Sequence, residues 1–142
     1  MNTVLIVEDE KMIRQGIKSM IQRSGVPVQT IIECSNGQMA LEVLQSQQID
    51  VMFTDIRMPK MDGITLVQEM QKFQRRPLTV VISGYDDFAY VRSALKLGVT
   101  DYLLKPIKAQ ELNQQLQRCI EILNQEEIVR PKAVMEAGFF AD

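Results

Sequence analysis

The sequence of 142 residues contains no histidine and only two cysteines. Without histidine the chain has no imidazole for acid–base catalysis or metal ligation, and it cannot donate a phosphoryl group from phosphohistidine. Cys34 and Cys119 lie far apart and form no CxxC pair, so they support neither a disulfide framework nor a zinc site, and we expect two packed thiols. Any chemistry must therefore use carboxylates, hydroxyls and lysine.

Long apolar runs are also absent. No stretch approaches the roughly 18 uninterrupted apolar residues of a membrane-spanning helix, and the N-terminus lacks the basic and apolar regions of a signal peptide. The net charge of -2 comes with no basic block of the kind that binds nucleic acid. We therefore expect one globular, cytoplasmic domain that binds neither membranes nor nucleic acid through these residues.

Strand-like and helix-like segments alternate along the chain. Apolar runs predict strands, and apolar stripes at helical spacing predict the helices between them. Gly98 stands where a helix C-terminal glycine belongs. The strands are expected at residues 4–7, 28–34, 50–54, 78–82 and 100–104, and the helices at residues 10–24, at 36–47, around Leu66, Val67, Met70 and Phe73, at 87–97, and from near Lys108 to Leu123.

The first, third and fourth apolar runs hardly alternate with polar residues, which is typical of parallel strands covered by helices on both faces. The second run, with Gln29, Thr30 and Glu33, is the most polar and predicts an edge strand. Strands and helices alternating at this length favour a doubly wound α/β fold. By analogy with common folds of this class, we expect a five-stranded parallel sheet in the order 2-1-3-4-5.

Four of the five runs end in polar side chains. Glu8 and Asp9 follow the first strand, Asp55 the third, Ser83 the fourth and Lys105 the fifth. Parallel strands end at the same edge of their sheet, which is where open α/β folds bind ligands. We therefore expect these side chains to meet in one acidic site.

Three carboxylates in one site need positive charge, because two like charges about 4 Å apart repel by roughly 4 kcal/mol at an effective dielectric constant of about 20. Mg²⁺ fits best, since it takes oxygen ligands and bridges carboxylate to phosphate. We expect Glu8 and Asp9 to hold the metal, and Asp55 to be the nucleophile that becomes an acyl phosphate. Lys105, the Ser83 hydroxyl and the amide after it would neutralise the oxygens of the transferred group.

Each of these residues also has an ordinary structural explanation when it is taken alone. Acids after a strand complement a helix N-terminus, and Asp55 can be a loop acid. A serine after a strand is commonly a turn or cap residue, and a Lys-Pro pair before a helix commonly only marks the boundary of that helix. Their joint placement at one sheet edge favours a shared site over four separate coincidences.

Four motifs carry a resemblance to the receiver domain of two-component response regulators, which extends over residues 2–123. The most specific of them surrounds Asp55. The motifs are Val7-Glu8-Asp9-Glu10, Thr54-Asp55-Ile56-Arg57-Met58-Pro59-Lys60-Met61-Asp62-Gly63, Ile82-Ser83-Gly84-Tyr85 and Asp101-Tyr102-Leu103-Leu104-Lys105-Pro106.

The resemblance implies a flavodoxin-like fold and a set of residue roles. Asp55 would be the phosphoacceptor, with Ser83 and Lys105 in contact with the phosphoryl group. A cis peptide bond before a proline, which otherwise occurs at only about 5–6% of such bonds, is expected at Pro106. The implied Mg²⁺ ligands are Glu8, Asp9, Asp55 and the backbone carbonyl of Arg57.

The resemblance also implies a partner, a sensor histidine kinase whose phosphohistidine donates to Asp55. Phosphorylation is then expected to favour one of two pre-existing conformations, in which Ser83 moves toward the phosphoryl group and Tyr102 shifts inward. The surface of the fourth helix, fifth strand and fifth helix would change. Tyr102 is explained equally well as a half-buried strand aromatic, and a homodimer is left open as a further partner.

The sequence around Asp55 and Ser83 resembles that of regulators that carry an AraC-type helix-turn-helix effector. We expect an excised receiver, residues 1–124, rather than a single-domain regulator, and assign DNA binding to the missing effector. Residues 125–142 are expected to extend the last helix or to form a linker or vector-derived tail, the alternative being a segment that docks on its own domain or a neighbouring protomer. We expect Arg57 and Tyr85 to slow self-dephosphorylation, because they border the path of the hydrolytic water.

Three other classes of protein share parts of this pattern. A haloacid-dehalogenase phosphatase would need Asp-x-Asp, which Asp55-Ile56-Arg57 does not match. A flavin-binding flavodoxin would need a phosphate loop rich in glycine and hydroxyls after the first strand, where this chain has acids, and no Walker A motif is present. A pseudo-receiver, which binds partners without phosphorylation, is disfavoured by the intact acids and Lys105. We therefore expect a phosphoacceptor switch rather than an enzyme.

Overall fold

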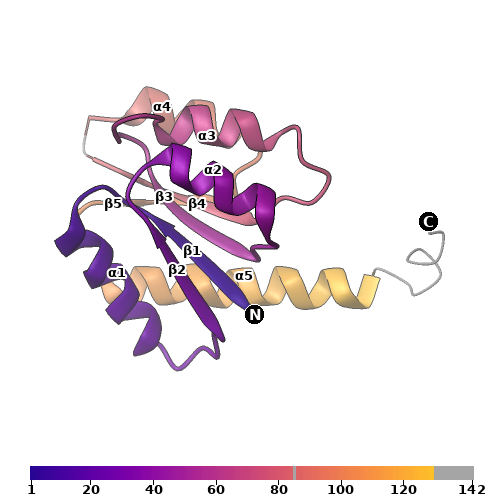
Figure 1. Ribbon diagram of the computed structural model, residues 1–142. Helices are drawn as coiled ribbons and strands as arrows, with labels where there is room; N and C mark the ends of the chain where they lie inside the picture. The colour runs from indigo at the N-terminus through magenta and orange to yellow at the C-terminus, as the bar shows by residue number, and fades with distance from the viewer. Residues whose placement is uncertain (85, 130–142) are drawn as a thin grey trace.

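The computed structural model describes residues 1–84 and 86–129, in which five strands alternate with five helices (Figure 1). Every predicted element is present, and most ends lie within two residues of the predicted ends. The strands are β1 (Thr3–Val7), β2 (Thr30–Cys34), β3 (Val51–Asp55), β4 (Leu78–Ser83) and β5 (Asp101–Leu104), and the helices are α1 (Lys11–Gln22), α2 (Gly37–Ser46), α3 (Gly63–Met70), α4 (Phe88–Lys96) and α5 (Ala109–Val129).

The strands form one parallel sheet in the order β2-β1-β3-β4-β5, which confirms the predicted fold and places β2 at an edge. Thr54, one residue before the end of β3, pairs with Val7 of β1, and Ser83 at the end of β4 pairs with Leu104 of β5. This register brings the ends of β1, β3, β4 and β5 to one edge of the sheet, so the residues that follow them share one region.

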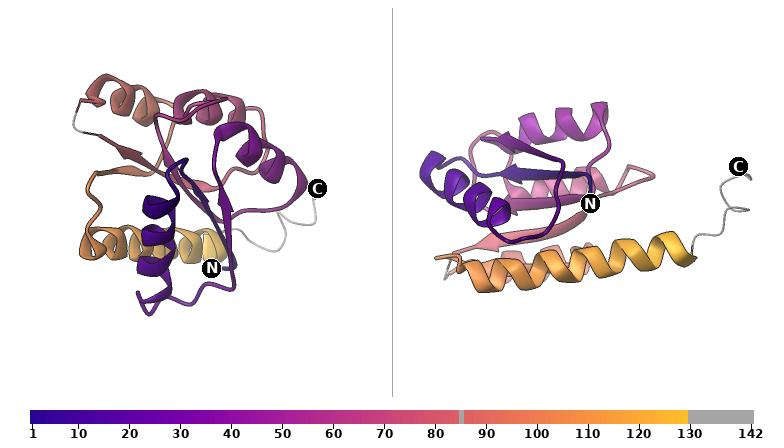
Figure 2. Two further views of the ribbon diagram at one scale, coloured as in Figure 1. Left: turned by 60° about the vertical axis from the view of Figure 1, so that its left-hand side comes forward. Right: turned by 90° about the horizontal axis from the view of Figure 1, so that it is seen from below.

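Helices cover both faces of the sheet, with α1 and α5 on one side and α2, α3 and α4 on the other (Figures 1 and 2). Along β1, Val4 and Ile6 pack toward α1 and α5, whereas Leu5 and Val7 belong to the core beneath α2 and α3. All four are fully buried. Burial of such a side chain contributes roughly 1.5–3 kcal/mol, which explains why both faces of the central strands are apolar.

The ends of several elements differ from prediction or lie outside the described residues. The third helix ends at Met70, so Phe73 falls in the turn after it, where its N–H donates to the Met70 carbonyl at 3.0 Å. Gly98 follows α4 with φ of 95°, as the helix C-terminal glycine should. Cys34 and Cys119 are free, buried thiols, as predicted. The last helix extends to Val129, whereas residues 130–142 and Tyr85 lie outside the described residues.

No helix in the described part of the chain is both long and apolar enough to cross a membrane.

Gly63 lets the start of α3 lie against the end of β3. A Cβ at this position would lie 2.2 Å from the backbone carbonyl oxygen of Asp55, and the Gly63 N–H donates to the Ile56 carbonyl at 2.7 Å.

We expect Gly63→Ala to lower the free energy of unfolding by roughly 1–3 kcal/mol in urea denaturation, because the added methyl group forces this backbone apart. Gly16→Ala in α1 is the control, since among the described residues no heavy atom beyond its chain neighbours and its own helix backbone lies within 4 Å of the added Cβ. Its stability should stay equal or rise, and an equal loss in both variants would contradict the steric explanation.

Candidate functional site

The carboxylates of Glu8, Asp9 and Asp55 converge at the ends of β1 and β3. One oxygen from each lies within 4.8 Å of the others, a spacing at which a metal ion could be held. Glu8 and Asp55 are almost completely buried, whereas Asp9 is exposed. The three acids that the sequence placed at strand ends therefore form one cluster with an opening to solvent on the side of Asp9.

Lys105, the residue after β5, adds a positive charge to this cluster. Its Nζ lies 2.9 Å from Asp55 Oδ2 and 3.4 Å from Glu8 Oε1. Its backbone N–H donates to the Ser83 carbonyl at 2.9 Å, and the peptide bond to Pro106 is cis. Burial alone would lower the pKa of Lys105, but the hydrogen bond and charge of Asp55 together with Glu8 raise it, so the side chain remains a cation.

Glu8 is a buried carboxylate whose pKa lies well above its ordinary value. Burial raises its pKa from 4.5 to about 7; the Glu10 N–H opposes the rise and the charge of Asp55 adds to it. Glu8 Oε2 accepts from the Glu10 N–H at 3.0 Å, whereas Oε1 is buried with no hydrogen-bond partner among the described residues. A buried carboxylate oxygen with Lys105 at 3.4 Å and no hydrogen bond is a suitable ligand for an additional cation.

Ser83 ends β4 beside this cluster. The side chain is completely buried, and its Oγ has no hydrogen-bond partner in the described part of the chain. The next backbone N–H, of Gly84, donates to Asp87 Oδ2 at 2.8 Å. Of the two expected donors at the end of β4, the Ser83 hydroxyl therefore has no hydrogen-bond partner among the described residues, while the Gly84 N–H is already occupied by a carboxylate.

Asp87 is a participant that the sequence analysis missed. It lies just before α4, is 3% exposed, and its Oδ1 accepts from Nε of Arg57. The Arg57 guanidinium also lies over the Tyr90 ring, 5.5 Å from its centroid. The signal was an acid before a helix, which normally indicates an N-cap, but Asp87 makes no side-chain cap hydrogen bond to α4.

Two of the expected residues, Arg57 and Tyr102, have exposed side chains. The side chain of Arg57 points to Asp87 and Tyr90 rather than to the acids. Tyr102 lies on β5 with 38% of its surface exposed. The proposed water path between Arg57 and Tyr85 falls partly outside the described residues.

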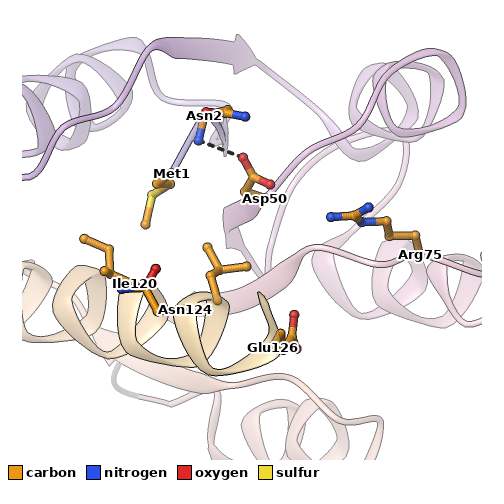
Figure 3. Close-up of a pocket in the computed structure, with 8 residues that line it drawn as sticks. Met1, Asn2, Asp50, Arg75, Ile120, Asn124 and Glu126 are labelled. Atoms are coloured by element: carbon orange, nitrogen blue, oxygen red, sulfur yellow. Dashed lines mark hydrogen bonds between the residues drawn. The ribbon is translucent and has the colours of Figure 1, made fainter. Parts of the chain in front are cut away.

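The pocket in Figure 3 lies at the other end of the sheet. Asp50, which directly precedes β3, accepts there from the Asn2 N–H at 2.8 Å, and Ile120 and Asn124 of α5 line the same pocket. A larger apolar groove of about 430 Å³ lies beside the acidic cluster, lined by α1 and by Lys105, Pro106 and Ile107. Of these two, only the groove shares a residue with the cluster.

A lysine in contact with a buried aspartate, next to two further acids at the ends of parallel strands, is the arrangement that the sequence motifs predicted. The family model described as "Response regulator receiver domain" matches residues 4–117. The chain belongs to this family. The receiver is similar to the transcriptional regulatory protein HptR of Staphylococcus aureus, with 34% identity over 120 residues that cover 84% of this chain and 47% of HptR.

Solved receivers show the same architecture. The REC domain of AraT, a response regulator from Geobacillus stearothermophilus, is 38% identical with a TM-score of 0.78, covering 88% of this chain and 97% of that one. A two component transcriptional regulator AraC from Clostridium phytofermentans is 30% identical with a TM-score of 0.78, covering 90% of this chain and 98% of that one. The receiver spans about half the length of the curated relatives it matches first.

Proposed function

We propose that this receiver is a switch in which Asp55 accepts a phosphoryl group from a sensor histidine kinase in the presence of Mg²⁺. The observation that carries the proposal is the 2.9 Å contact between Lys105 Nζ and Asp55 Oδ2 beside two further acids. A lysine in this place holds a nucleophilic carboxylate in position and offers positive charge to an arriving phosphoryl group.

The transfer forms one bond and breaks one. A carboxylate oxygen of Asp55 attacks the phosphorus, and the bond from phosphorus to the donor nitrogen breaks, leaving its electron pair on the donor imidazole. The equatorial oxygens need donors, which we assign to Lys105 Nζ, to the unpaired hydroxyl of Ser83 and to the Gly84 N–H. The product is an acyl phosphate on Asp55, so the chain is a phosphoacceptor with self-dephosphorylation rather than a turnover enzyme.

Mg²⁺ would be held by the three carboxylates and by the backbone carbonyl of Arg57. The fit is supported by Oε1 of Glu8, which has no hydrogen-bond partner among the described residues, by the spacing of the three ligand oxygens, and by an all-oxygen donor set. When bound, the ion supplies positive charge that offsets the repulsion between the acids and the phosphoryl group.

The output would be a change of the surface formed by α4, β5 and α5. Ser83 would move toward the phosphoryl group and Tyr102 would turn inward from its half-exposed position. Because similar proteins are transcriptional regulators, we assign this chain to the receiver of such a regulator. Residues 1–124 would be the receiver unit, and residues 125–142 would extend the last helix or form a linker.

Incubation with acetyl phosphate and Mg²⁺ tests the proposal. Intact-mass measurement should show the gain of one phosphoryl group, the gain should disappear when Mg²⁺ is removed by EDTA, and borohydride trapping followed by peptide mapping should locate it on Asp55. A chain that gains no phosphoryl mass would overturn the mechanism, and an adduct on another residue would move the site.

The pKa of Glu8 predicts a pH-dependent effect of Mg²⁺ on stability. In the metal-free chain the unfolded state loses the Glu8 proton near pH 4.5 and the folded state near pH 7, so this group costs folding up to about 3 kcal/mol as the pH rises through that window. Mg²⁺ binds the ionised form, so it should raise the melting temperature clearly at about pH 8 and much less at about pH 5.5. Glu8→Gln should flatten the pH dependence of the metal-free chain. An equal Mg²⁺ shift at both pH values would contradict this assignment.

A further inference from the structure

The Asp87 carboxylate binds two groups that flank the acidic cluster. Oδ2 accepts from the Gly84 N–H at 2.8 Å, and Oδ1 accepts from Arg57 Nε. Gly84 follows β4 and Arg57 follows β3, so this one carboxylate connects the two loops that leave the neighbouring central strands. Only 3% of its surface is exposed, and a buried carboxylate without these partners would be costly.

Helix capping does not explain this arrangement. Asp87 stands at the N-cap position of α4, where an aspartate ordinarily accepts a hydrogen bond from the first turn. Its side chain makes no such bond and turns back to the residue after Ser83 instead. Arg57 holds it there, and the guanidinium rests at the same time on Tyr90 of α4.

The Gly84 N–H is also a donor that a phosphoryl group on Asp55 needs. Asp55 pairs with Ile82 across β3 and β4, so Gly84 begins the loop directly beside the phosphoacceptor. An N–H carries one hydrogen and makes one good hydrogen bond at a time. A phosphoryl oxygen and the Asp87 carboxylate are both anions, so they cannot occupy this donor together.

We propose that the Asp87 carboxylate, held in place by Arg57, accepts a hydrogen bond from the Gly84 N–H that would otherwise bind a phosphoryl oxygen, and that phosphorylation of Asp55 displaces this carboxylate. The inference rests on the proposed function of Asp55. The Asp87 carbonyl accepts from the Val91 N–H at 3.0 Å, so displacement of Asp87 also moves the first turn of α4. That turn carries the exposed Phe88 and Tyr90, which couples the chemistry at Asp55 to the surface of α4.

The experiment compares Asp87→Ala, Asp87→Asn and Arg57→Ala with the matched control Asp86→Ala, an exposed acid one position earlier. Phosphorylation by acetyl phosphate should be about tenfold faster in Asp87→Ala, because a charged competitor for the N–H is removed. Arg57→Ala should act in the same direction, and the double variant should add little, because the two residues act as one unit. Asp87→Asn keeps an acceptor and should be intermediate, and Asp86→Ala should match the wild type.

A spectroscopic measurement separates this inference from the proposed function. In ¹⁵N–¹H spectra of the metal-free chain, the Gly84 cross-peak should shift much further in Asp87→Ala than in Asp86→Ala, whether or not the chain can be phosphorylated. After phosphorylation, the Gly84 peaks of wild type and Asp87→Ala should coincide. A wild type that gains no phosphoryl group overturns the proposed function. Normal phosphorylation with equal rates in all variants and distinct phosphorylated Gly84 peaks overturns the role of Asp87.

Discussion

Asp55→Asn is expected to leave the chain unable to gain a phosphoryl group from acetyl phosphate, with the fold retained. An amide has nearly the shape of the carboxylate, and its oxygen can still accept from Lys105 Nζ, which lies 2.9 Å away. The amide oxygen is a far weaker nucleophile and forms no acyl phosphate, so the loss should be complete within the sensitivity of intact-mass measurement. Removing one negative charge beside Glu8 should also lower the pKa of Glu8, since the charge of Asp55 raises it.

The matched control is Asp50→Asn, because Asp50 directly precedes β3 while Asp55 ends it. Asp50 Oδ2 accepts from the N–H groups of Asn2 and Thr3 at 2.8 and 2.9 Å, at the opposite edge of the sheet (Figure 3). Asparagine can accept the same bonds, so this variant should be phosphorylated at the wild-type rate. A phosphoryl gain in Asp55→Asn equal to that of wild type would show that another residue is the acceptor.

The sequence predicted the cluster because each of its residues ends a strand or follows the end of one within two residues. The residues of β3 that lie in the core are mostly apolar, and polar residues begin where the strand leaves the core. Asp55 is therefore recognisable as the first charged residue after an apolar run. Parallel strands share one edge for their ends, and this topological rule brings Glu8 and Lys105 to Asp55 without any knowledge of side-chain packing. Burial of Val4 to Val7 on both faces likewise follows from the composition of β1.

Other features depend on side-chain choices that local sequence does not determine. Arg57 is exposed over most of its side chain, yet it pairs with Asp87, 30 residues later. Asp87 in turn has a local alternative, the cap of α4, which it does not take. The end of α3 at Met70 was missed for a related reason: Phe73 keeps helical spacing because it packs on the same core from a turn.

Lys105→Met is expected to reduce the rate of phosphorylation by acetyl phosphate by roughly 10²–10³-fold, the usual loss when one donor to a developing charge is removed. Methionine keeps most of the length and apolar volume of the lysine stem, which lies against the groove beside α1. The change leaves Glu8 and Asp55 without the cation that lies 3.4 and 2.9 Å from them. Because Lys105 lowers the pKa of Glu8, that pKa should rise further, and the metal-free variant should lose stability at about pH 8 relative to pH 5.5 more steeply than wild type.

Lys108→Met, at an exposed position three residues later, is the control for loss of one positive charge in the same loop. Both variants change the net charge equally, so a long-range effect on the phosphodonor would slow both, whereas contact with Asp55 predicts slowing in Lys105→Met alone. Mg²⁺ should still bind Lys105→Met, and with higher affinity, because the lysine and the metal compete for the same carboxylates. Tighter Mg²⁺ binding together with slow phosphorylation would separate the role of Lys105 in transfer from any role in assembling the acidic cluster. Wild-type phosphorylation rates in Lys105→Met would remove the lysine from the mechanism.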